Sequence, residues 1–181
     1  MSASRRFLPA ARASLLALAL ASPLAFAGHL NILLNADLDG RQEVNTSGNN
    51  AIVGDPAGRG EFYAFGIDEN RHTLCYNLQV KRIDELAMAP GNGRAAHIHR
   101  GKAGESGPVV ANIAWPQGGQ SADCLNGLTQ PARFVLTNTG FADADALIAD
   151  ILANPQNYYV NVHNSKFPSG AVRGQLAEAR P

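Results

Sequence analysis

Residues 61–83 read EFYAFGIDENRHTLCYNLQVKRI, and this stretch decides the fold. In its second half the side chains alternate between apolar and polar, and this period of two predicts a half-buried strand over residues 73–83. The first half predicts a partner strand over residues 61–67, and the turn residues 68–70 separate the two. The stretch therefore predicts an antiparallel hairpin. The apolar face of its second strand holds Leu74, Tyr76, Leu78 and Val80.

The same short apolar pattern recurs along the rest of the chain. Residues 143–154 differ, because their apolar side chains follow helical spacing and Pro155 ends the segment, so they predict a helix. About eight strands and one short helix indicate an all-β domain, a Greek-key β-sandwich or barrel. A single helix also provides too few crossovers for a long parallel sheet. The further strands are predicted over residues 29–38, 95–99, 109–115, 133–138, 158–163 and 171–177.

Residues 1–27 have a different character. They place three arginines ahead of or beside a short apolar run and end in Ala25-Phe26-Ala27, which is the pattern of a cleaved signal peptide. The apolar run is much shorter than the roughly 20 residues that span a bilayer. We therefore expect a signal peptide over residues 1–27, one domain over residues 28–181, and a periplasmic or secreted protein. The adjacent Arg5 and Arg6 leave the export route open between the general secretory and the twin-arginine pathways.

The charge balance excludes one class of partner. The whole chain carries 15 basic and 15 acidic side chains, but the leader holds three of the basic ones and none of the acids. Cleavage leaves a mildly acidic chain, which argues against a nucleic-acid binder. No second apolar span follows, so no membrane span is expected after cleavage. The partner expected is an unidentified protein or another component of the cell envelope.

Cys75 and Cys124 are the only cysteines of the chain. An oxidising compartment favours joining them, and no CxxC spacing supports a redox or thiolate metal site instead. We therefore expect a structural disulfide that closes a loop of about 50 residues.

Three of the five histidines lie where they could act together. On an extended strand His97 and His99 point to one face and Ile98 to the other, and His163 follows the same alternation in a later strand. Two imidazoles from one strand and one from another form a workable ligand set for copper or zinc. Strand histidines also often bond only to nearby loops, and the sequence does not show whether His163 lies near the pair. A mononuclear copper or zinc site and a purely structural role both remain open.

Complete catalytic signatures are missing. The sequence has no G-x-S-x-G elbow, and the glycine-rich segment at residues 101–107 lacks the Lys-Ser/Thr ending that would hold a phosphate. These observations favour a binding or structural module without enzymatic turnover, while enzymatic activity stays open.

Three strings together resemble one family. They are LDGRQEV at residues 38–44, AHIHRGKAGESGPVV at residues 96–110 and YVNVHNSKFPSGAVRGQL at residues 159–176. In this order they resemble the chordin-type (CHRD) domain of bacterial secreted proteins, over about residues 30 to 178. The resemblance places Glu43, Asn161 and Arg173 at motif positions, beside the histidines. It departs at Ala171, where the family commonly has a Glu, and at Asn164, where a Thr is common.

The resemblance implies a Greek-key sandwich in an exported protein, and it implies no defined reaction. The chain is more loosely similar to copper-zinc superoxide dismutases, which combine an H-x-H strand, a later histidine, a disulfide and an arginine near the C-terminus. That similarity implies copper at His97, His99 and His163, with Arg173 steering an anion. No cluster of zinc ligands follows between residues 100 and 130, so a two-metal dismutase is not expected. Metal handling or dismutase-like redox chemistry at a single ion is the alternative function.

Overall fold

The predicted hairpin forms the long edge of the domain. In the computed structural model, which describes residues 34–47, 49, 51–68, 73–83 and 95–179, β2 (Arg59–Asp68) pairs antiparallel with β3 (Thr73–Lys81). Side chains along β3 alternate between buried and partly exposed, as the period of two predicts. The predicted signal peptide and part of the hairpin turn lie outside the described residues, as do the two remaining histidines of the chain, His29 and His72.

Nine strands and one α-helix make up the described chain, so the prediction of an all-β sandwich or barrel with one helix is confirmed. Helix α1 (Ala144–Ala153) begins after Asp143, whose side chain accepts a hydrogen bond from the Ala146 N–H. The other strands are β1 (Leu34–Asp39), β4 (Ala96–Arg100), β5 (Val109–Asn112), β6 (Gln120–Asn126), β7 (Tyr158–Val162), β8 (Val172–Gln175) and β9 (Ala177–Glu178). Short 3-10 helices are η1 (Gly40–Gln42), η3 (Gln117–Gly119), η4 (Pro131–Arg133) and η5 (Pro155–Asn157).

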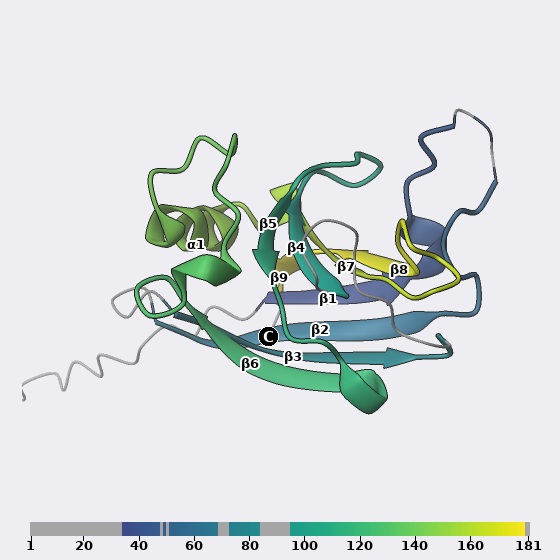
Figure 1. Ribbon diagram of the computed structural model, residues 1–181, viewed down its shortest axis with the longest axis horizontal. Helices are drawn as coiled ribbons and strands as arrows, with labels where there is room; N and C mark the ends of the chain where they lie inside the picture. The colour runs from purple at the N-terminus through teal and green to yellow at the C-terminus, as the bar shows by residue number, and fades with distance from the viewer. Residues whose placement is uncertain (1–33, 48, 50, 69–72, 84–94, 180–181) are drawn as a thin grey trace, which may run out of the picture.

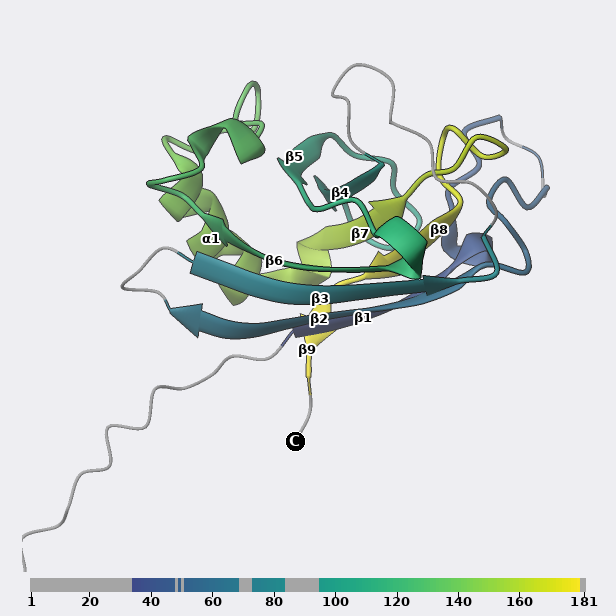
Figure 2. The ribbon, with the colours of Figure 1, turned by 60° about the horizontal axis from the view of Figure 1, so that its bottom comes forward.

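The strands form one curled antiparallel sheet in the order β5-β4-β7-β8-β1-β2-β3-β6, with β9 beside β1. Strands far apart in the sequence become neighbours at the β4–β7, β8–β1 and β3–β6 pairs. Because the sheet is curled, the half that contains β1, β2, β3 and β6 lies opposite the half that contains β4, β5, β7 and β8, and α1 lies at one end (Figures 1 and 2). The space between the two halves and α1 is filled by apolar side chains. The largest fully buried ones include Phe62, Tyr76, Ile98, Leu147 and Tyr158.

Two sequence predictions fail in the segment between β5 and α1. The prediction of a strand over residues 133–138 is wrong: this segment follows a 3-10 turn that starts at Pro131, and it pairs with the sheet only at a single bridge from Phe134 to Ala111. The strand that completes the sheet is β6, over the polar sequence QSADCLN, which the apolar pattern did not predict. β6 is an edge strand beside β3, where polar side chains are tolerated because one face meets solvent.

The predicted disulfide is confirmed. Cys75 on β3 and Cys124 on β6 lie directly opposite each other in the strand register, and their sulfurs are bonded. The bond fastens the edge strand to the sheet. Within the part of the chain that the structure describes, no helix is long and apolar enough to cross a membrane.

Candidate functional site

The register of three strands gathers the motif residues on one face. Asn161 of β7 lies directly between His97 of β4 and Arg173 of β8, because each pairs with it in the sheet. Two residues along the strands, Tyr159 lies in the same way between His99 and Gln175. The residues between them, such as Ile98 and Val160, point into the apolar core. The face of β4, β7 and β8 that points away from the core therefore carries His97, His99, Tyr159, Asn161 and Arg173, and it is called the polar face below.

This polar face is covered, not open. The loop between β4 and β5 lies over it, because Tyr159 and Gln175 bond to Gly107 and Gly101 of that loop. His97 is 1% exposed and Asn161 is 3% exposed. Side chains that would be solvated on an ordinary strand face are therefore enclosed here.

The three predicted histidines converge. The His97 Nδ1 atom lies 3.1 Å from the Nε2 atom of His163. One ring nitrogen from each of His97, His99 and His163 lies within 4.8 Å of the other two, and among the described residues this is the group of side chains placed to hold a metal ion. The H-x-H strand and the later histidine thus meet, although 66 residues separate His97 from His163.

Two backbone carbonyls fix the tautomers of the cluster. His99 Nδ1 lies 2.9 Å from the Gly107 carbonyl oxygen, and His163 Nδ1 lies 3.0 Å from that of Pro168. A carbonyl only accepts, so both Nδ1 atoms carry the proton and both Nε2 atoms present a lone pair. A carbonyl behind each ring is the arrangement that orients metal-ligating histidines. His99 Nε2 is buried and has no hydrogen-bond partner among the described residues, so its lone pair is unused.

Burial keeps these rings neutral. Burial lowers the pKa of His99 to about 4, and the charges of His163 and Arg173 also lower it. The hydrogen bond to Gly107 acts in the opposite direction. Burial also lowers the pKa of His163, although the bond to Pro168 opposes the shift. At neutral pH the lone pairs of both rings are therefore free of protons, as ligation requires.

The geometry fits one metal ion after a small adjustment. Zinc–nitrogen bonds of about 2.0 to 2.1 Å place tetrahedral ligands roughly 3.3 Å apart. The separation of His97 and His163 is already close to this value, although with these tautomers the contact is a hydrogen bond from the His97 Nδ1–H to His163 Nε2, and a metal ion would have to displace that proton. The 4.8 Å limit of the whole group means that the nitrogens must close by about 1.5 Å at most before all three could bind one ion.

Glu43 is hydrogen-bonded to Asn161, which lies beside His97 in the sheet. The Asn161 amide donates to both carboxylate oxygens of Glu43, at 2.8 and 3.1 Å, across 118 residues of sequence. Gly170 adopts φ of +141°, and a Cβ there would lie 2.5 Å from Glu43 Oε1, so only glycine fits between this carboxyl and its loop. Burial raises the pKa of Glu43 to about 8, although Arg173 and the Asn161 bond act against the shift. Glu43 is therefore mostly protonated at neutral pH.

Arg173 holds the covering loop. The side chain is 2% exposed, and its guanidinium donates to the carbonyls of Lys102 at 2.8 Å and Glu105 at 2.7 Å. Its Cζ atom lies 3.4 Å from the centre of the Tyr159 ring, which stacks in turn on His99 at 4.7 Å. An arginine used in this way is anchored to the backbone and is poorly placed to steer an anion from solvent.

The site also contains groups to which the sequence analysis assigned no role: the Tyr159 ring and the carbonyls of Gly107 and Pro168. Tyr159 precedes Asn161 by two residues, so strand alternation alone places it on the same face. The two carbonyls had no comparable signal, because they come from loops whose course depends on tertiary contacts.

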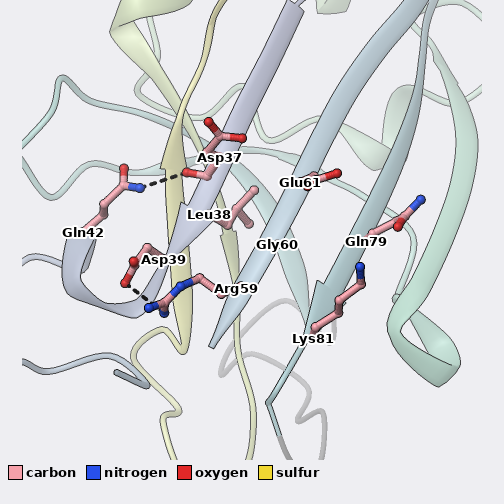
Figure 3. Close-up of a pocket in the computed structure, with 9 residues that line it drawn as sticks. All are labelled: Asp37, Leu38, Asp39, Gln42, Arg59, Gly60, Glu61, Gln79 and Lys81. Carbon is pink, nitrogen blue, oxygen red and sulfur yellow. Dashed lines mark hydrogen bonds and ion pairs between the residues drawn. The ribbon is translucent and has the colours of Figure 1, made fainter. Parts of the chain in front are cut away.

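Two open hollows lie away from the histidines. A groove of about 380 Å³ crosses the outer face of β1, β2 and β3, where Asp37, Glu61 and Lys81 line it (Figure 3). Asp39, at its end, pairs with Arg59 at 3.4 Å. A second hollow, of about 440 Å³, is lined by Glu43, Arg173 and neighbouring residues at the edge of the polar face. None of the three histidines lines either hollow.

The protonated state of Glu43 leads to a prediction about pH. A folded-state pKa raised from 4.5 to about 8 favours folding below pH 4.5, and that advantage is lost as pH rises through 8. Glu43→Gln has no proton to lose, so we expect the wild type to lose stability relative to this variant between pH 5 and pH 8, by about 3 kcal/mol. Urea unfolding of both proteins at the two pH values measures the difference, and titration of His99 cancels in the comparison.

The exposed Glu61 is the control for that experiment, because Glu61→Gln removes the same charge from the other half of the sheet. Its pH dependence should follow that of the wild type. If Glu43→Gln also follows the wild type, Glu43 is ionised in the folded protein and the prediction is wrong.

Comparison with known proteins identifies the family. The model of the CHRD domain matches residues 34–176, which is most of the chain and contains all three motif strings. No match was found among curated proteins or among solved structures. Membership of this family supports a binding or structural module. The chain belongs to the CHRD domain family.

Proposed function

We propose that this CHRD protein is an exported binding module that holds a single copper or zinc ion with His97, His99 and His163. One observation carries the proposal: three imidazoles converge, two of them buried and one partly buried, and backbone carbonyls hold the Nδ1 protons of two rings so that their Nε2 atoms are left with a lone pair. Imidazole is a ligand for both metals.

Export is supported by two features outside the site. The N-terminal 27 residues have the pattern of a signal peptide. The Cys75–Cys124 disulfide is typical of an oxidising compartment such as the periplasm or the extracellular space. The partner that the module serves is a protein or another component of the cell envelope.

Holding a metal fits the site better than turning over a substrate. The cluster lies under the loop between β4 and β5, and His97 and His163 are 1% and 6% exposed. Arg173, the cation that a dismutase-like reaction would use, is bonded to two loop carbonyls. Metal handling is therefore the proposed role, and superoxide chemistry gains no support from the arrangement of Arg173.

Metal titration of the exported chain tests the proposal. Wild-type protein should bind one Cu or Zn ion per chain, measured by calorimetry and by elemental analysis after gel filtration. His163→Ala should weaken binding about 100-fold, because one of three bonds is lost, and the triple variant His97→Ala, His99→Ala, His163→Ala should not bind.

His72→Ala is the matched control, because His72 lies outside the motif strings. This variant should bind like the wild type. Retention of one tightly bound ion by the triple variant, with its circular dichroism spectrum unchanged, would show that these histidines are not the ligands.

A further inference from the structure

We infer that the three-histidine site takes copper as Cu(I), in preference to Cu(II) and to zinc. This inference rests on the proposed function, and it goes further by naming the oxidation state. Three properties of the polar face carry it: the number of ligands, the exclusion of water, and the charges around the histidines.

The number of ligands comes first. The cluster supplies three nitrogens, and among the described residues no carboxylate or further imidazole belongs to the group. Zinc and Cu(II) favour four or more ligands. Cu(I) is stable with three nitrogens in a plane, and bonds of about 2.0 Å then require nitrogens roughly 3.5 Å apart. The spacings of 3.1 Å and up to 4.8 Å lie on either side of this value.

Water cannot readily supply a fourth ligand. His97 and His163 are almost fully buried, and the Nε2 atom of His99 is also shielded from solvent. The Tyr159 ring lies parallel to the His99 ring, and the Tyr159 hydroxyl bonds to Gly107 of the covering loop. A divalent ion would have to give up its waters on entering this face, which is costly for a strongly hydrated ion.

The charges around the three histidines also favour Cu(I) over a divalent ion. The cost of burying an ion rises with the square of its charge, and three neutral imidazoles offset none of it. Arg173 adds a positive charge behind Tyr159, and its bonded partners are neutral carbonyls. The guanidinium lies against the Tyr159 ring, and Tyr159 stacks on His99, so its positive charge acts against a second positive charge at the histidines.

The nearby acids do not reverse this balance. Glu43 is mostly protonated at neutral pH because burial raises its pKa to about 8. The carboxylate of Glu105 lies close enough to attract the Arg173 guanidinium. It is on the exposed loop, however, where water screens its charge. The described surroundings of the histidines are therefore neutral to positive, and a monovalent ion is the better match.

Competition titrations of the exported chain test the inference. Cu(I) is titrated without oxygen against bicinchoninate, and Cu(II) and Zn(II) are titrated against chelators of known affinity. We expect the protein to hold Cu(I) at least 100-fold more tightly than Cu(II). That ratio corresponds to a reduction potential about 120 mV above that of aqueous copper, at 59 mV per tenfold for one electron. Copper-loaded protein in air should show little of the Cu(II) paramagnetic resonance signal.

Two variants of Arg173 separate the charge from the covering loop. Arg173→Met removes both the charge and the two bonds that hold the loop, whereas Arg173→Lys weakens those bonds but keeps the charge. The preference for Cu(I) over Cu(II) should therefore be about tenfold lower in the methionine variant than in the lysine variant, and Arg59→Met, which removes a charge from the groove on the other half of the sheet, should leave it unchanged. His99→Asp is a separate test of charge at the site that does not depend on Arg173, because a carboxylate in the ligand set should shift the preference toward the divalent ions by at least tenfold.

The outcomes separate this inference from the proposed function. Histidine-dependent binding of Cu(II) or zinc as tight as that of Cu(I) would overturn the inference and leave the metal site in place. Binding of no ion, or binding that the triple histidine variant retains, would overturn both. Preference for Cu(I) that disappears in the triple variant supports both.

Discussion

Replacing Cys75 and Cys124 together by alanine is expected to lower the free energy of unfolding by about 4 kcal/mol. The two residues are separated by 49 positions, so the bond closes a loop of about 50 residues in the unfolded chain. The lost restriction of the unfolded chain accounts for this magnitude. The folded state is affected locally as well, because β6 is an edge strand that pairs only with β3 among the named strands. Urea unfolding followed by circular dichroism measures the loss, and hydrogen exchange should show faster opening of β6.

The sheet itself provides a matched control. Gln79 and Gln120 face each other across the same two strands, without a covalent bond. Replacing both by alanine should change stability by less than about 0.5 kcal/mol. An equal loss in the two double variants would mean that side-chain packing at the edge, and not the disulfide, fastens β6.

The strands that the sequence predicted correctly are those with one apolar face. In β3, burial and alternation coincide residue by residue, so the period of two was sufficient. Helix α1 was equally readable, because Leu147, Ile148, Ile151 and Leu152 form one stripe and Asp143 caps it. In both cases the signal is local, since each element shows its buried face within its own sequence.

The two errors arise where tertiary contacts override local preference. Residues 133–138 contain Phe134, Val135 and Leu136, which favour a strand. Arg133, however, bonds to the Asn112 carbonyl and to Asp123, and Asn138 turns the chain at φ of +61°. β6 has the opposite character: its own sequence is polar, and its partner β3 makes it a strand.

The candidate site was predictable as a set of residues but not as a geometry. Alternation placed His97 and His99 on one face, and it did the same for Asn161 and His163. The meeting of these pairs depends on β4 lying beside β7, which no local pattern specifies. The contact of Glu43 with Asn161 joins residues still farther apart in the sequence, and it depends on η1 lying beside β8. The family resemblance marked all of these positions without stating what they contact.

Arg173→Met is expected to cost about 4 kcal/mol and to release the loop over the histidines. The guanidinium makes two short, charge-assisted hydrogen bonds to the Lys102 and Glu105 carbonyls, and each such bond is worth roughly 1.5 to 3 kcal/mol. Methionine fills much of the same volume but donates nothing, so both carbonyls lose their partner. The stacking of the cation on Tyr159, at 3.4 Å, is lost as well. Urea unfolding measures the stability, and proteolysis near residues 102–105 measures release of the loop.

Two further variants show why the geometry of arginine matters there. Lysine at position 173 keeps the charge but cannot direct two fixed N–H groups at two carbonyls, so Arg173→Lys should recover no more than about half of the loss. Arg41→Met removes a guanidinium whose side chain is 54% exposed, and it should change stability by less than about 0.5 kcal/mol. Full recovery by lysine would show that charge alone holds the loop. In that case the neutral carbonyls of residues 102 and 105 would contribute little, and the cation would stabilise this face mainly through Tyr159 and the neighbouring acids.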